Sequence, residues 1–185
     1  MMRWIIEANA ARMPLADVNV PRPAPEGKGF RGSFLFAAMK ITSSAFSDGK
    51  LIPSKYTCDG ADLIPPLAFE DVPSEAVTLA LIVDDPDAPG GTFDHWLVWN
   101  IAPDVRAIAE GRALEGVTGN NSARKAAWMG PCPPDREHRY IFTLYALDGR
   151  LDLPAGSNKP QLQSAMKDHV IAKAQLMGRY DRVRS

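Results

Sequence analysis

The chain has 185 residues, of which 45% are hydrophobic and 23% charged, and its formal net charge is −1. This length and composition suit a soluble domain with a sizeable core. Proteins that bind nucleic acid duplexes are normally strongly basic, so a nearly neutral chain excludes nucleic acid as the expected partner. Since no stretch reaches the length of a membrane span and Glu7 interrupts the apolar start, we expect no stable membrane insertion and a cytoplasmic location.

Residues 1–38 differ in composition from the rest of the chain. The stretch 21–29 combines several prolines with two glycines, a composition typical of a linker. Met39 then opens a pattern of short extended segments and turns. We therefore predict two parts, an N-terminal appendage or linker over 1–38 and a folded domain over 39–185.

Short extended segments dominate the predicted domain. The first three are expected over 40–46, 51–57 and 65–70. The clearest strand is 76–84, in which both alternating faces are largely apolar, so we expect it to lie centrally between two layers.

Further strands are predicted later in the chain, over 96–101, 105–110 and 140–147. Short strands separated by glycine and proline turns are typical of an antiparallel β-sandwich. Only the carboxyl end shows a helical pattern. Ser157 or Asn158 is expected to cap a helix in which a stripe of apolar residues extends to Met177, with Gly178 as its stop.

Two motifs place rigid residues immediately before a histidine. The first runs from Asp84 to Pro89 and is followed by His95-Trp96, and the second is Gly130–Pro134, followed by His138-Arg139-Tyr140. Proline removes a hydrogen-bond donor and fixes φ, so a strand in a sheet has no need of prolines at its start. The two motifs therefore predict one pocket at the ends of adjacent strands, with stiff walls.

Asp85 is the residue in this predicted pocket with the strongest need for a partner. A carboxylate at the end of a buried strand is costly unless it is paired, and either His95 or His138 would serve. Such a pair would raise the imidazole pKa, and partly charged imidazoles attract phosphate or carboxylate. Arg139 remains open at this point between an anion ligand and a structural ion pair.

The pocket walls are expected to be built from prolines and aromatic side chains. Pro89 and Pro133 would keep the cavity open, and the Ala88–Pro89 bond is the first candidate for a cis peptide. Trp96 and Tyr140 would line it, and Ser122 is the one serine in a loop expected to reach it.

Catalytic and metal-binding motifs are missing from the sequence. It contains neither a G-x-S-x-G elbow nor a phosphate-binding glycine loop, which favours a non-catalytic binding protein. The alternative is a weak hydrolase that uses the His95/Asp85 pair. Cys58 and Cys132 show no metal-ligand spacing, so we expect no metal and no cofactor, and two reduced thiols, with a single disulfide as the alternative.

Together the two motifs resemble the phosphatidylethanolamine-binding protein family, and most closely its bacterial branch, which is also described as Raf-kinase-inhibitor-like. The resemblance extends over about residues 39–182 and includes Tyr56–Gly60 and Phe142–Asp148. It implies a mainly β fold, an antiparallel β-sandwich with short helices and a carboxyl-terminal helix near the pocket. It also implies a pocket for small anions or phosphorylated head groups.

The family's pocket positions can be carried over residue by residue. They fall on five residues with two aromatic neighbours, namely Asp85, Pro89, His95, Pro133 and His138, with Trp96 and Tyr140 beside them. The resemblance also raises a protein partner such as a kinase or protease and, by analogy with bacterial relatives, a homodimer.

The chain departs from the family pattern at Asp135-Arg136-Glu137, where bacterial relatives often have a glycine. The two acidic residues are expected to weaken anion capture at the pocket rim, and Arg136 to oppose that effect.

Overall fold

The computed structural model describes residues 38–182. The predicted appendage over 1–38 lies almost wholly outside the described residues, and its boundary at residue 39 stays a prediction. The described elements are β1 (Lys40–Thr42), β2 (Lys50–Leu51), the 3₁₀ turn η1 (Ser54–Tyr56), β3 (Leu67–Glu70), β4 (Thr78–Asp85), β5 (Phe93–Ile101), β6 (Ala107–Ile108), β7 (Val117–Thr118), β8 (His138–Leu147), α1 (Lys159–Met166) and β9 (Val170–Tyr180).

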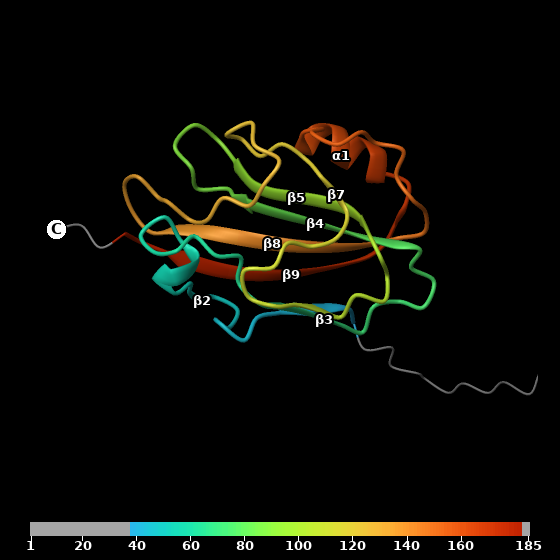
Figure 1. Cartoon of the computed structure of the whole chain (residues 1–185), viewed down its shortest axis with the longest axis horizontal. Coiled ribbons are helices and arrows are strands. Elements are labelled where there is room, and N and C mark those ends of the chain that lie inside the picture. The colour runs from blue at the N-terminus through green and yellow to red at the C-terminus, as the bar shows by residue number, and fades with distance from the viewer. Residues whose placement is uncertain (1–37, 183–185) are drawn as a thin grey trace, which may run out of the picture. The chain divides into compact units, whose positions relative to one another are not determined.

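These strands form the predicted sandwich of two sheets. The smaller sheet has the order β1-β3-β6 and the larger the order β2-β9-β8-β4-β5-β7. All pairings are antiparallel except that between β2 and β9, which is parallel. Figure 1 shows β3 on one side of the larger sheet and α1 on the other. Among the described residues no helix is long and apolar enough to cross a membrane.

Strand β4 lies centrally between layers, as its two apolar faces predicted. On one face Leu79, Leu81 and Val83 belong to the core cluster that also contains β3. On the other face Ala80 and Ile82 pack in a second cluster with α1. Alternate residues of a strand point to opposite faces, so a strand covered on both sides needs apolar side chains at every position.

The predicted carboxyl-terminal helix is largely wrong. Asn158 does cap α1, with Pro160 in its first turn, but the helix ends at Met166 and the chain continues as β9. Apolar residues spaced by four lie on one face of a helix and equally on one face of a strand, so the spacing did not distinguish the two. Gly178 lies within β9 as a close-packing residue, because a Cβ there would approach Phe46 to 2.9 Å and come closer still to Ile52.

Candidate functional site

Three strands of the larger sheet converge at one end. β4 ends at Asp85, whereas β5 begins at Phe93 and β8 begins at His138. Because β4 runs antiparallel to both neighbours, its last residue adjoins the first residues of β5 and β8. The two sequence motifs thus meet where the prediction placed them, and Figure 1 shows their loops gathered at the left-hand end.

Asp85 is paired with His138. Its Oδ2 lies 2.7 Å from His138 Nδ1, and both side chains are buried. The other carboxylate oxygen accepts a hydrogen bond from the backbone N–H of Asp87 at 2.8 Å. Both oxygens of this buried carboxylate are therefore satisfied, and the choice that the sequence left open is resolved in favour of His138.

The second ring nitrogen of His138 also faces a carboxylate. Its Nε2 lies 2.9 Å from Oδ1 of Asp135. A neutral imidazole has one N–H to donate and an imidazolium has two, so two carboxylate partners favour the charged ring. Burial by itself lowers the pKa of His138, but the hydrogen bonds that its ring donates to Asp85 and Asp135 outweigh this effect and raise the pKa.

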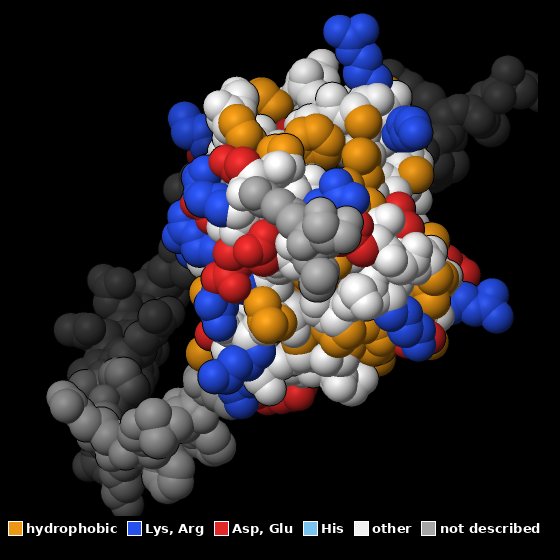
Figure 2. All heavy atoms as spheres, turned by 90° about the vertical axis from the view of Figure 1, so that its left-hand side faces the viewer, with side chains coloured by type: hydrophobic (Ala, Val, Ile, Leu, Met, Phe, Trp, Pro, Cys, Tyr) orange, Lys and Arg blue, Asp and Glu red, His pale blue; other side chains and the backbone are white. Residues whose placement is uncertain are grey.

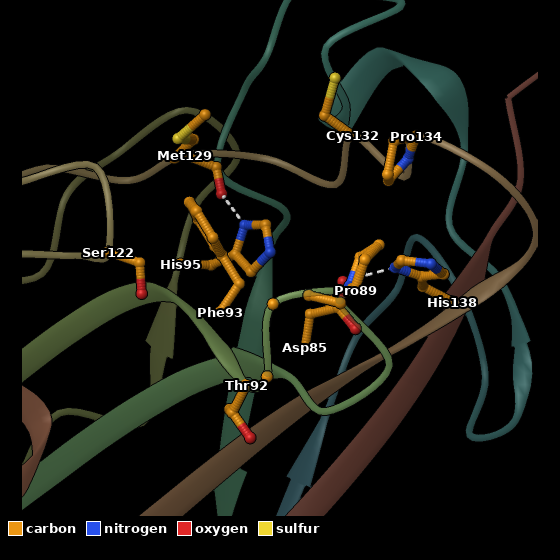
Figure 3. Close-up of a pocket in the computed structure, with 13 residues that line it drawn as sticks. Asp85, Pro89, Thr92, Phe93, His95, Ser122, Met129, Cys132, Pro134 and His138 are labelled. Carbon is orange, nitrogen blue, oxygen red and sulfur yellow. Dashed lines mark hydrogen bonds and ion pairs between the residues drawn. The ribbon is translucent and has the colours of Figure 1, made fainter.

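His95 is neutral, in contrast to His138. Its Nδ1 lies 2.6 Å from the carbonyl oxygen of Met129, and since a carbonyl only accepts, Nδ1 carries the ring proton. Burial lowers the pKa of His95, so the ring is neutral near pH 7 and its Nε2 is a hydrogen-bond acceptor. Figure 3 shows this second nitrogen turned toward the space bounded by Cys132 and Pro134. The expectation of two partly charged imidazoles is therefore wrong for His95.

A cavity of about 430 Å³ lies between the two histidines. Its walls come from the end of β4, the loop before β5, the start of β5 and the loops before β8 (Figure 3). The lining residues are Asp85, Ala88, Pro89, Gly90, Gly91, Thr92, Phe93, His95, Ser122, Met129, Cys132, Pro134 and His138.

Four of the seven predicted pocket residues line this cavity, namely Asp85, Pro89, His95 and His138. The other three, Pro133, Trp96 and Tyr140, are buried beside it or away from it. Pro133 is buried between two lining residues. Tyr140 packs its ring edge-on against His95, with ring centroids 5.2 Å apart.

Trp96 faces away from the cavity, although it follows His95 directly. Successive strand residues point to opposite faces, and Trp96 packs edge-on against Trp128 at 5.8 Å. It borders a separate hollow of about 370 Å³.

The sequence analysis did not single out the loop residues Gly90, Gly91 and Thr92, nor Phe93, the Met129 carbonyl or Asp135 as a histidine partner. Phe93 had a signal, because it lies two residues before His95 and positions i and i+2 share one face of a strand.

The wall before β8 is fastened to the segment around η1. Cys58 and Cys132 form a disulfide, and the Cys58 N–H donates to the Pro131 carbonyl at 3.1 Å. The Gly130 N–H donates to Asp62 Oδ1 at 2.8 Å. The prediction of reduced thiols is therefore wrong. The predicted cytoplasmic location stays a prediction, and this bond counts against it because disulfides persist mainly in oxidising compartments.

The wall before β5 contains the first proline motif. Among the described residues no peptide bond is cis, so the predicted cis bond at Ala88–Pro89 is wrong. The loop turns instead at Gly91, whose φ of 101° favours glycine. Ser122 reaches the cavity because its Oγ accepts from the Asp94 N–H at 2.8 Å.

Arg139 forms a structural ion pair with Asp87. Its Nε and a terminal nitrogen each donate to one carboxylate oxygen at 2.8 Å, and its backbone N–H donates at 3.0 Å. The hydrogen bonds from Arg139 lower the pKa of Asp87 to about 2. The guanidinium is thus committed to joining the two motifs.

The rim residues Asp135, Arg136 and Glu137 have separate partners. Arg136 pairs with Asp135 at 2.7 Å, whereas Glu137 pairs with Arg179 at 2.7 Å. Figure 2, which looks onto this end, shows acidic and basic side chains intermingled rather than a patch of one sign. Within residues 38–182 no group of three His, Cys, Asp or Glu side chains is placed to hold a metal ion.

The family model described as phosphatidylethanolamine-binding protein matches residues 42–181. The chain belongs to this family. A family member from Chlamydia muridarum, described as a UPF0098 protein, is 49% identical over 148 residues, which cover 77% of this chain and 99% of that protein. A UPF0098 protein from Methanothermobacter thermautotrophicus is 47% identical over 150 residues, and the match covers 78% of this chain and 99% of that protein.

Solved structures of family members confirm the fold. A crystal structure of a putative phosphatidylethanolamine-binding protein homologue from Chlamydia trachomatis matches with a TM-score of 0.77 at 49% identity, and covers 78% of this chain and 98% of that one. The crystal structure of E. coli YbcL, described as a new member of the mammalian phosphatidylethanolamine-binding protein family, matches with a TM-score of 0.73 at 27% identity. The match covers 79% of this chain and 99% of the YbcL chain.

Proposed function

We propose that this protein is a non-catalytic binding protein whose cavity accepts a phosphate-like anion or a phosphorylated head group. The observation that carries the proposal is the buried His138 ring in the wall of the cavity, with a carboxylate at each of its nitrogens, an arrangement that favours the imidazolium. A buried, protonated imidazole is a strong donor to an oxyanion, because charge-assisted hydrogen bonds are stronger than neutral ones and burial limits their screening. The name of the family is consistent with a ligand that contains a phosphate.

The cavity walls support a preformed site. The disulfide, the Asp62 hydrogen bond and the ion pair between Arg139 and Asp87 hold the two loops without a ligand. Because the loops are already ordered, ligand binding loses less conformational entropy than it would if it had to order them.

The alternative of a weak hydrolase loses its premise. It relied on a His95/Asp85 pair, but Asp85 is bonded to His138 and His95 to the Met129 carbonyl. A protein partner remains part of the proposal, because a phosphorylated side chain of a kinase or protease presents the same oxyanion as a head group. The predicted homodimer stays a prediction.

An NMR titration of the three histidines with inorganic phosphate and with phosphoethanolamine tests the proposal. We expect saturable shifts at His95 and His138, and no shift at His169, which is exposed and paired with Asp148. The His138→Gln variant should lose the saturable response, whereas His169→Gln should keep it. The proposal fails if neither cavity histidine responds, or if His169 responds equally.

A further inference from the structure

The cavity end of the molecule contains three cations that are each already paired with a carboxylate. His138 donates to Asp85 and Asp135, Arg139 is held by Asp87, and Arg136 pairs with Asp135. An incoming oxyanion therefore reaches the N–H at His138 Nε2 only by displacing an internal carboxylate.

We infer that Asp135 is the displaceable carboxylate and determines the specificity of the site, because its side chain occupies the His138 Nε2 donor that an external oxyanion would use. This inference rests on the proposed function and adds to it a selection among anions. Asp135 acts as an internal competitor, and a ligand binds only when it competes successfully for that donor.

Asp85 and Asp135 differ in how firmly they are held. The Asp85 side chain is 5% exposed, and its second oxygen is bonded within its own turn. The Asp135 side chain is 45% exposed and its other partner is Arg136, which is itself largely exposed. The exposed pair with Arg136 contributes little to stability, so Asp135 is held mainly by its bond to His138, and an oxyanion that replaces this bond can displace Asp135 while Asp85 stays in place.

Displacement of Asp135 releases two donors at once. The Nε2–H of His138 becomes available, and so does the guanidinium of Arg136, which also lies 3.4 Å from the Asp87 carbonyl at the same rim. A phosphate monoester dianion has three acceptor oxygens and more charge than a carboxylate, so it can engage both donors.

A simple carboxylate has no such advantage. It brings the same single charge as the Asp135 side chain, and Asp135 is tethered three residues from His138 at high effective concentration. The selected ligands are therefore phosphate-like dianions, and free monocarboxylates are rejected.

Glu137 provides a matched control. It lies two residues from Asp135 and has the same charge, but its carboxylate pairs with Arg179 and not with His138. Removal of either carboxylate changes the net charge equally and releases one arginine, so the loss of the contact with His138 is what Asp135→Ala adds.

The experiment measures the binding of inorganic phosphate and of acetate to the wild type, Asp135→Ala and Glu137→Ala, by the NMR signals of His138 at about pH 7.5, where phosphate is mostly dianionic. If Asp135 covers the donor in about 90% of molecules, its removal should tighten phosphate binding about tenfold.

Acetate should bind to Asp135→Ala but not to the wild type. Glu137→Ala should stay within about twofold of the wild type for both anions. Asp135→Asn, which keeps the shape of the side chain, should give an intermediate affinity.

Each result decides the inference. If the wild type binds phosphate and Asp135→Ala binds it no more tightly, the inference is overturned while the proposed function stands. If both alanine variants tighten binding equally, general repulsion explains the effect and the inference is again overturned. Phosphate binding by Asp135→Ala alone would show that Asp135 covers the donor but would overturn both the proposed function and the selection of phosphate by the wild type, and failure of all variants to bind phosphate would overturn both ideas.

Discussion

The Nδ1 of His138 lies 2.7 Å from Oδ2 of Asp85, although 53 positions separate the two residues in the chain. This buried contact joins the two proline motifs across β4 and β8, which are neighbours in the larger sheet. With Asp135 on the other ring nitrogen, it makes the charge of His138 a contribution to folding as well as to the site.

We expect the stability to depend on pH in opposite directions through the two cavity histidines. The pKa of His138 is raised in the folded protein, so its stabilisation is complete below about pH 6.5 and is lost as the pH rises through the raised pKa. The pKa of His95 is lowered, so the fold loses stability as the pH falls below about 6.5, where the unfolded chain binds the proton more readily.

Urea unfolding of single variants between about pH 5 and 9 separates the two histidines, because this window spans the ordinary histidine pKa. His138→Gln should remove the alkaline decline in the free energy of unfolding, and His95→Gln the decline below neutral pH. His169→Gln, a change at an exposed pair, serves as the control. An unchanged alkaline decline in His138→Gln would contradict the assigned charge state.

Reduction of the Cys58–Cys132 disulfide is expected to destabilise the fold. The bond links residues 74 positions apart, and closing a loop of that length typically contributes about 2–4 kcal/mol. Dithiothreitol should therefore lower the urea midpoint of the wild type. The Cys58→Ser/Cys132→Ser double variant should have the same low urea midpoint as the reduced wild type, and dithiothreitol should not change it. Equal midpoints for oxidised and reduced wild type would show that the disulfide contributes no stability.

The sequence predicted well what local patterns determine. Two apolar faces identified β4 as a central strand, and prolines before His95 and His138 located the cavity at the strand ends. A strand covered on both sides and a proline-rich turn leave a signal in consecutive residues, so no long-range information was needed.

The errors have a common origin in contacts between distant residues. β9 exists because it pairs with β8, and an apolar spacing of four cannot report that pairing. The Cys58–Cys132 bond and the choice of His138 over His95 by Asp85 depend on which loops the fold brings together. Strand bulges such as that between Val83 and Asp84 further alter which side chains meet at the cavity.

Two glycines near the cavity should respond very differently to alanine. A Cβ at Gly130 would lie 2.5 Å from the Tyr56 carbonyl oxygen and also collide with the Asp62 carboxylate that anchors this loop. Gly90 has open space around it and an ordinary φ. We expect Gly130→Ala to cost at least about 2 kcal/mol, because the loop has to move. Gly90→Ala should change the free energy of unfolding by less than about 1 kcal/mol, with slight stabilisation.

Urea unfolding of both variants provides the measurement, and the cavity histidines report the local effect. Gly130→Ala should shift the NMR signals of His95, whose Nδ1 is bonded to the residue immediately before Gly130. Similar stability for the two alanine variants would mean that the wall before β8 is not held as tightly as its contacts indicate.

Lys159 fastens α1 to the strand ends that bear the site. Its ammonium pairs with Asp84 and lies 3.1 Å from Oδ1 of Asp94, residues that face each other across β4 and β5. Burial alone would lower the pKa of Lys159, but the two carboxylates raise it. Lys159→Met should cost about 3 kcal/mol, because it leaves two adjacent, largely buried carboxylates without a cation.

The control is Lys55→Met, which breaks an exposed pair with Glu110 and should cost less than about 1 kcal/mol. Adding Asp94→Asn to Lys159→Met should restore part of the lost stability, since it removes one of the two repelling charges. The cluster also reaches the cavity, because the Asp94 backbone N–H is the donor that holds Ser122. Lys159→Met should therefore shift the Ser122 amide signal as well, and a loss of stability without that shift would confine the role of Lys159 to anchoring the helix.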